Sequence, residues 1–431
     1  MSNLNGTLED NKQNGERTSK PLINSIDYTY NVNRLPVARS SVGGIYLYGV
    51  DNNYPYKVME LAKRSSSLKT AINTQSKFIQ GLGFDGATAS DVKKGNAIKL
   101  NENGLTAYNL LKYCAYSKSN INVAIHVNYN QLGEAVGFTP VSYDFVRLKV
   151  LDYNDIFEQF IITNFWHLED NKNNFGYNNY TNTETFENWL RDKKLNNNLI
   201  SLCVYAYNPD PYIVREQIAM SGGIENYPGQ LYYVKDTTDV YQLAIYDSVL
   251  DDAQFESESK LWSLSSVQNS FSLSGIFKYY ANMEGNDEFI SVKRKLQNTT
   301  GSINAGRMLA VPYLPGTDGI PNNVFEPINL QNIDKLFTVQ KEECKQNINE
   351  IFNTPKALIG KDTTGNFATQ DVQDQFNFYN SITEQLRNDV EIDLTKLISN
   401  SIFESSFKLP IEIAPLEYNV KQKTNQNETI N

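Results

Sequence analysis

The sequence predicts an α+β chain, because strand patterns and long helical stripes occupy separate parts of it. Apolar residues alternate along residues 120–130 and 135–143, and the Asn- and Gly-containing turn between these runs predicts a β-hairpin. Apolar residues also recur at steps of three and four from Val372 to Leu397, which indicates one face of a long α-helix. A similar stripe ends just before Pro355, a residue that stops helices.

Length and charge set the first limits on function. The chain has 431 residues, a formal net charge of −10 and a sequence pI of about 5.0. This length is enough for two to four compact units with a sizeable core. The acidic balance argues against a protein that grips nucleic acid along a broad basic face, but it is compatible with one past which DNA slides.

The cysteine and histidine content argues against a metal or redox site. Cys114, Cys203 and Cys344 are scattered without ligand spacing, which favours a reducing compartment and inert thiols. His126 and His167 lie far apart, so neither a His-based metal site nor a catalytic triad is expected, and no cofactor is expected either. The N-terminus has no secretory signal pattern. The sequence contains no run of about 18 apolar residues, so no membrane span is expected.

The first half of the chain reads as an arm followed by helices and then strands. Residues 1–40 are rich in Asn, Ser, Thr, Lys and Glu and are expected to form a mobile arm. One helix is predicted from Tyr54 to Ile79, where Gly81 and Gly83 stop it. The remaining predicted elements are helices at 105–116 and 186–194, the hairpin at 120–143, and strands at 146–151, 157–166, 199–207 and 230–234.

The second half predicts two helices that flank a small insert. The first helix spans residues 246–267 and has a broad acidic side made of Asp247, Asp251, Asp252, Glu256 and Glu258. The insert is predicted to contain strands at 275–280, 307–311 and 324–328 and a helix at 287–297 that carries Lys293, Arg294 and Lys295. The returning helix spans residues 330–352, and one further strand is expected within 401–415.

Residues 354–369 separate the returning helix from the last long helix, and two interpretations of them stay open. They form either an ordinary helix connection or a functional loop, since structureless connections of this length are uncommon and usually functional. The polar part of the stretch consists of Lys361, Asp362, Thr363, Thr364, Gly365, Asn366 and Phe367.

The charged groups also allow two interpretations. The acidic side of the 246–267 helix is either a solvated surface or a face that lines a channel, where phosphates would be repelled. The Lys293–Lys295 triplet is more typical of a solvated helix face than of a phosphate contact.

A search for catalytic patterns finds none, so the chain is not expected to be an enzyme. Pro355 occupies the place of the upstream glycine that a phosphate-binding loop would need before Gly360 and Lys361. The adjacent carboxylates Asp251-Asp252 and Glu342-Glu343 would point to different faces of their helices.

The order of these elements and several local motifs resemble the tailed-bacteriophage portal protein family over residues 54–400. Residues 301–308 resemble the family's G-x-x-N-A-G-(K/R) run before a strand, and residues 332–355 resemble its helix that ends in F-x-x-P. Leu358, Ile359 and Gly360 look like the family's P-x-x-L-(L/I)-G motif, and residues 366–376 and 227–252 resemble the starts of two of its helices. Asn353 replaces the glycine that is usual before Thr354.

The resemblance implies a portal-like subunit that forms closed homo-oligomeric rings, usually dodecamers, around a DNA channel. It implies a wing that holds residues 41–239 and, at the C-terminal side, 370–416 with the long helix. It further implies two stem helices at 240–270 and 330–353, a small α/β clip at 271–329, a tunnel loop at 354–369, and disordered ends at 1–40 and 417–431.

The resemblance also implies partners and a location. The expected partners are double-stranded DNA, a terminase, the major capsid or scaffold protein, and neck or tail adaptors, with no membrane. The expected location is the portal vertex of the virion, after assembly in the host cytoplasm. The clip residues expected to dock terminase are Lys293, Arg294, Lys295, Asn304 and Arg307. The alternatives are another phage neck or baseplate protein, or a cytoplasmic hydrolase with an unrecognised carboxylate site.

Overall fold

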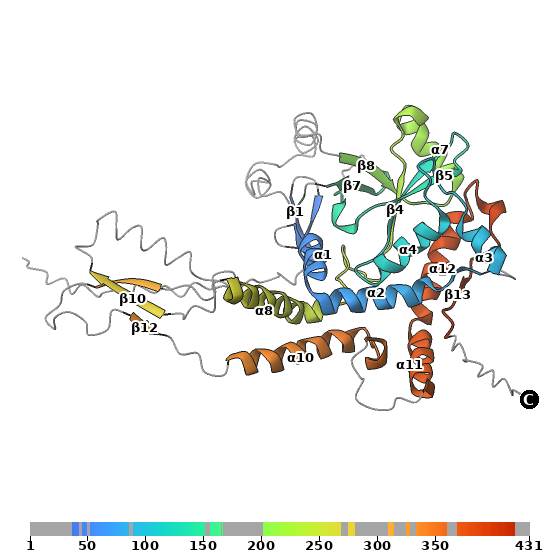
Figure 1. Cartoon of the computed structure of the whole chain (residues 1–431). Coiled ribbons are helices and arrows are strands. Elements are labelled where there is room, and N and C mark those ends of the chain that lie inside the picture. Colours follow the sequence, from blue (N-terminus) through green and yellow to red (C-terminus); the bar gives the residue numbers. More distant parts are fainter. Residues whose placement is uncertain are drawn as a thin grey trace, which may run out of the picture. The chain divides into compact units, whose positions relative to one another are not determined.

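The protein has an α+β fold, as predicted (Figure 1). The computed structural model describes residues 37–42, 45–49, 52–85, 89–150, 156–164, 166, 201–268, 275–280, 309–313, 325–327, 333–359 and 369–418. Within these residues the strands form separate sheets, and the largest of them is built from residues 124–233.

The largest sheet has six strands in the order β5-β4-β9-β8-β7-β6. All neighbouring pairs are antiparallel except β8 and β9, which are parallel. The predicted hairpin is confirmed, with Val127 opposite Phe138. The strands are β4 (Ala124–Tyr129), β5 (Ala135–Pro140), β6 (Val146–Leu148), β7 (Gln159–Thr163), β8 (Ser201–Ala206) and β9 (Gln230–Tyr233).

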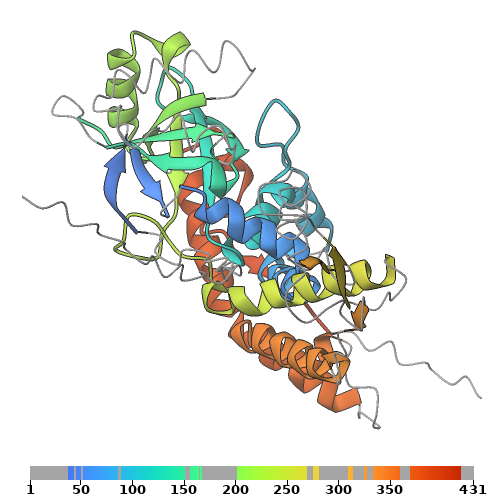
Figure 2. The same ribbon diagram turned by 90° about the vertical axis from the view of Figure 1, so that its left-hand side faces the viewer.

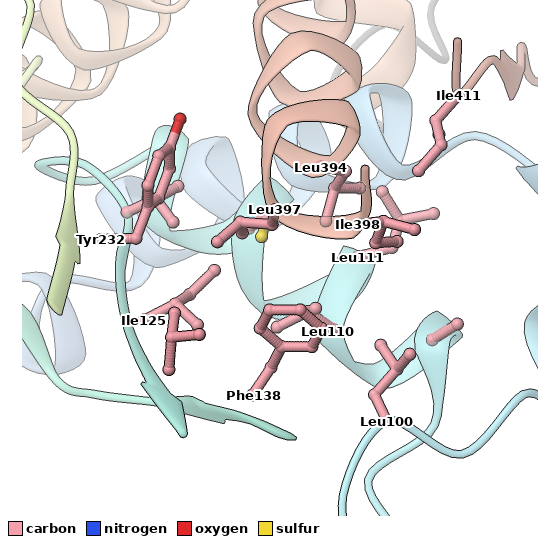
Figure 3. Packing of buried hydrophobic residues seen from close by; sticks show 14 of the residues in the cluster. Leu100, Leu110, Leu111, Ile125, Phe138, Tyr232, Leu394, Leu397, Ile398 and Ile411 are labelled. Atoms are coloured by element: carbon pink, nitrogen blue, oxygen red, sulfur yellow. The ribbon is translucent and has the colours of Figure 1, made fainter. Parts of the chain in front are cut away.

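Helices pack against this sheet and enclose the main core. Leu394, Leu397 and Ile398 of the last helix, α12 (Glu384–Ile398), are fully or almost fully buried in the core, where Leu110 and Leu111 of α4 (Ala107–Lys118) are also buried (Figure 3). The same cluster includes buried side chains of β4, β5 and β9. The apolar stripe predicted toward Leu397 is therefore the core face of α12.

Two predicted helices are each divided into two. The helix predicted from Tyr54 to Ile79 is α1 (Tyr54–Arg64) and α2 (Ser66–Gln80), and Ser65 between them accepts a hydrogen bond from the Leu68 backbone N–H. The long helix predicted after residue 369 is α11 (Thr369–Ile382) and α12, and the Thr383 hydroxyl at their junction donates to the Tyr379 carbonyl. Apolar periodicity continues across both breaks, so periodicity alone misses them.

Several elements were not predicted. They are β1 (Val37–Val42), β2 (Ile45–Tyr48), β3 (Gly83–Phe84), α3 (Ala89–Asn96) and α7 (Pro211–Met220). Residues 37–40 were assigned to the arm, but they belong to β1, which pairs with β2. The expected late strand is the short β13 (Ile413–Ala414), which pairs with β3. The predicted helix at 186–194 and the rest of the arm lie outside the described residues.

Truncating a core residue of α12 tests this packing. Leu394 is 0% exposed and Ile392 on the same helix is 52% exposed. We expect Leu394→Ala to lower the free energy of unfolding by roughly 2–5 kcal/mol, because it removes buried contacts and leaves a cavity. We expect Ile392→Ala to change it by less than about 1 kcal/mol. Urea unfolding of both variants measures the difference, and equal losses would contradict the assigned core face.

Candidate functional site

Two long helices of the second half form an antiparallel pair. They are α8 (Leu250–Gln268) and α10 (Ile333–Ile351), which pack side by side (Figure 2). The Asn347 side-chain amide donates to Asp252 Oδ1 at 3.2 Å, and the Tyr246 and Phe352 rings stack at 6.2 Å. These contacts place the first turn of α8 beside the last turn of α10, so the two helices are antiparallel.

A three-stranded sheet is built entirely from the segment between these two helices. Its central strand β10 (Gly275–Tyr280) pairs in parallel with β11 (Leu309–Tyr313) and antiparallel with β12 (Phe325–Pro327). All three strands were predicted. The helix expected at 287–297 and the candidates Lys293, Arg294, Lys295, Asn304 and Arg307 lie outside the described residues.

The chain leaves α10 through a tight turn. Asn353 has φ +49°, and the Thr354 backbone N–H donates to the Asn349 carbonyl at 2.9 Å. This is a helix C-cap with a left-handed residue, a position that glycine or asparagine can occupy. Asn353 therefore fits the position at which the family resemblance leads us to expect glycine.

The two ends of the predicted loop lie close together. The short 3₁₀ helix η5 (Lys356–Ile359) contacts α11, and the Ala357 backbone N–H donates to Gln375 Oε1 at 3.3 Å. The buried Thr354 hydroxyl lies 3.4 Å from the Tyr379 hydroxyl. The chain thus departs and returns at one place. The candidates Lys361, Asp362, Thr363, Thr364, Gly365, Asn366 and Phe367 themselves lie outside the described residues.

The base of this loop is anchored by aromatic packing. Phe78 of α2 packs against Phe376 at 4.9 Å and against Tyr379 at 4.8 Å, both from α11. Arg387 of α12 donates to the Phe78 carbonyl at 3.2 Å. The packing contacts at this point therefore join α2 to α11 and α12.

Glu256 was one of five acidic residues proposed to lie on a solvated or channel-lining face, and its burial contradicts both interpretations for this residue. Its side chain is 0% exposed and lies at the N-terminus of α2. Its carboxylate accepts hydrogen bonds from the hydroxyls of Ser65, Ser66 and Ser67, from the Ser67 backbone N–H and from Lys260 Nζ. A buried carboxylate requires such partners, and the positive end of the helix dipole favours it further.

The hydrogen bonds decide the charge state of Glu256. Burial alone would raise its pKa, but the hydrogen bonds from Ser65, Ser66, Lys260 and Ser67 outweigh burial and lower the pKa from 4.5 to about 2. The side chain is therefore ionised at neutral pH and fastens α8 to the junction of α1 and α2.

The other four acidic candidates lie at different depths on the surface. Asp247 is half-buried and accepts a hydrogen bond from the Tyr54 hydroxyl at 2.6 Å. Asp251 is exposed, whereas Asp252 and Glu258 are half-buried. Whether any of them lines a channel depends on neighbouring copies of the chain. The channel-facing role of these four residues therefore stays a prediction.

A network that the sequence reading missed fixes the entry to α8. Arg147 is 0% exposed and donates to Asn52 Oδ1 and to the Asn52 and Asp144 carbonyls. Its guanidinium lies 5.4 Å from the centre of the Tyr48 ring, which stacks on Tyr241 at 4.2 Å. Burial lowers the pKa of Arg147. The only sequence signal was an arginine between two apolar strand residues.

Further bonds tie the same connection to the sheet unit. Tyr241 donates to the Tyr46 carbonyl at 2.6 Å, and the Ile245 backbone N–H donates to the Asn120 carbonyl at 2.9 Å. The almost buried Lys118 ammonium lies 2.8 Å from the Asp236 carboxylate. The start of α8 is consequently held from several directions.

The described residues contain no group of three or more His, Cys, Asp or Glu side chains that could hold a metal ion. Burial, as the largest cause, raises the pKa of the Cys344 thiol to about 12 and also raises that of Cys114. Both thiols are therefore protonated, and they pack in the interior. Among the described helices, none is long and apolar enough to cross a membrane.

Comparisons with known proteins give structural neighbours only. No protein-family model and no curated protein matches the chain. One solved structure, "Neck of native GTA particle computed with C12 symmetry", contains a similar chain with a TM-score of 0.47 and 13% identity, and the match covers 90% of each chain. Another, "Virion of native gene transfer agent (GTA) particle", has a TM-score of 0.46 and 13% identity over 89% of this chain and 88% of that one.

A third, "Neck of empty GTA particle computed with C6 symmetry", has a TM-score of 0.43 and 12% identity over 85% of each chain. With TM-scores below 0.5, these likenesses carry no weight for the function of this chain.

Replacing Glu256 by glutamine tests its role. A carboxyl whose pKa falls from 4.5 to about 2 on folding stabilises the folded state above pH 4.5, and this stabilisation is lost as the pH falls toward 2. We expect Glu256→Gln to lower the free energy of unfolding at pH 7 by roughly 2–3 kcal/mol. The difference from wild type should shrink between pH 5 and pH 3.

The matched control is Glu343→Gln, which replaces an exposed carboxylate on α10. Urea unfolding across this pH range should show a change of less than about 0.5 kcal/mol for the control. A Glu256→Gln effect that does not vary with pH would contradict the assignment of an ionised, buried carboxylate.

Proposed function

We propose that this chain is the subunit of a phage-type portal, a closed homo-oligomeric ring through which double-stranded DNA passes during packaging and ejection. The observation that carries the proposal is the antiparallel pair α8 and α10 flanking the β10–β12 sheet. Repetition of this unit around an axis gives a tube with helical walls and one small sheet per subunit.

The loop between η5 and α11 is proposed to be the element that contacts DNA. Its two ends are held together by contacts among Thr354, Ala357, Gln375 and Tyr379. Small polar side chains such as Thr363 and Asn366 can touch phosphates without binding them tightly, which suits a moving substrate.

The acidic side of α8 is proposed to keep DNA moving. Symmetry multiplies each carboxylate around a ring, and a ring of negative charge repels phosphates. Asp247, Asp251, Asp252 and Glu258 remain candidates for this role, since each has at least partial exposure in the single chain. Glu256 has no part in it, because its charge is used inside the subunit.

The proposed mechanism is mechanical and electrostatic and includes no chemical step in this chain. A separate terminase would supply ATP hydrolysis and dock on the insert through Lys293, Arg294, Lys295, Asn304 and Arg307. Capsid or scaffold proteins and neck or tail adaptors would bind the same ring at the portal vertex of the virion, after assembly in the host cytoplasm.

The oligomeric state is the first test. We expect the purified chain at micromolar concentration to form a closed ring, with twelve copies as the family resemblance suggests, because large apolar side chains such as Leu264 of α8 and Val339 of α10 are exposed in the single chain. Native mass spectrometry gives the number of copies, and negative-stain images give the central hole. A chain that stays monomeric across several salt concentrations would overturn the proposal.

The loop itself is the second test. Replacing residues 361–369 by a short Gly-Ser linker should leave ring assembly near wild type, because the packing lies in the flanking helices. The DNA packaged per particle should fall sharply. Rings that package DNA normally, or a failure to form rings, would reduce this stretch to a plain connector.

The contrasting variant for the loop test is Leu386→Asp. Leu386 packs against the main core from α12, so this variant places an unpaired charge in an apolar environment. It should damage folding itself, which circular dichroism and urea unfolding detect. The two variants together separate a loop that acts on DNA from a helix that holds the subunit.

A further inference from the structure

Charged side chains are sorted between the exposed faces of two helices. The chain as a whole carries −10, yet α1 and α2 together contain five cations, Lys57, Lys63, Arg64, Lys69 and Lys77, and the single acid Glu60. This local excess of cations makes the surface of α1 and α2 complementary to a negatively charged one.

The exposed face of α2 has a regular pattern. Lys69, Asn73 and Lys77 are all exposed and follow one another at steps of four residues, so they form one stripe along the helix. With a rise of 1.5 Å per residue, the two ammonium-bearing positions are about 12 Å apart along the axis.

The exposed face of α10 carries the matching pattern with opposite charge. Glu342, Gln346 and Glu350 are exposed at the same steps of four residues, so the two carboxylate positions are also about 12 Å apart. Glu342 also bonds Lys345 at 2.8 Å, and Gln346 donates to Glu350 at 2.7 Å. Val339 lies on the same face and is 56% exposed, which gives this stripe an apolar end.

We infer that the α2 stripe of one copy packs against the α10 stripe of the next copy, with Lys69 and Lys77 facing Glu342 and Glu350 and with Asn73 opposite Gln346. This inference rests on the proposed ring. A ring needs two different complementary surfaces on each subunit, joined head to tail, and the two stripes supply such a pair. Each contact also neutralises part of the mutual repulsion between subunits that carry −10.

Charge exchange tests the inference. The variant Lys69→Glu with Lys77→Glu carries acids on both stripes, and the variant Glu342→Lys with Glu350→Lys carries cations on both. We expect each double variant to lose its rings to monomers in native mass spectra, because like charges then meet and weaken each contact by at least about tenfold.

Two restorations make the test specific. The chain that combines all four substitutions should form rings again. An equimolar mixture of the two double variants should form rings in which the two chains alternate, since each stripe then meets its opposite. A matched reversal at other exposed lysines, Lys93→Glu with Lys112→Glu, should leave the rings intact. Unchanged circular dichroism and thermal unfolding show that the variants fold.

The outcomes separate this inference from the proposed function. If the wild-type chain forms rings and the double variants also assemble, the stripe contact is overturned and the ring proposal stands. The same holds if the double variants lose their rings but neither the combined chain nor the mixture recovers them. A wild-type chain that never forms rings would overturn both. Loss of rings with equal loss in the Lys93 and Lys112 control would assign the effect to net charge and also overturn the contact.

Discussion

The position of α8 depends on one buried carboxylate. Glu256 is wholly enclosed and stays ionised only because Ser65, Ser66, Ser67 and Lys260 surround it with hydrogen-bond donors. This requirement explains why the first helical stretch breaks at Ser65, since an uninterrupted helix would have no free N-terminus there. Because α10 packs on α8 and α2, the anchor also sets the location of the returning helix.

The two connections of the helix pair to the rest of the chain are held by different kinds of contact. The entry to α8 is held by Tyr48, Tyr241 and Lys118, whose aromatic, hydrogen-bonding and ionic contacts involve residues 236–249, and Arg147 packs over the Tyr48 ring. The exit from α10 is held by a C-cap at Asn353, by the buried side chains of Phe352 and Thr354, and by polar contacts from Thr354 and Ala357 to α11. Both ends of the helix pair are therefore tied to the rest of the subunit.

Fewer carboxylates of α8 are exposed than its sequence suggests. Of the five carboxylates on the acidic side of α8, Glu256 is used inside the subunit and Asp247 is tied to the Tyr54 hydroxyl. The negative charge of the chain is therefore less concentrated on this helix than its sequence implies. The exposed cations of α2 and the exposed acids of α10 give the single chain two surfaces of opposite charge.

The sequence by itself determined the α+β class, the hairpin, the three insert strands and the helix pair that flanks them. Each of these depends on local periodicity or on a turn residue, which a single sequence displays. The tertiary structure alone decided the breaks at Ser65 and Thr383, because both interrupt stripes whose apolar spacing continues. It also decided the roles of Glu256 and Arg147. A charged residue reads as exposed in a sequence, and only distant donors and acceptors brought together by folding make its burial possible.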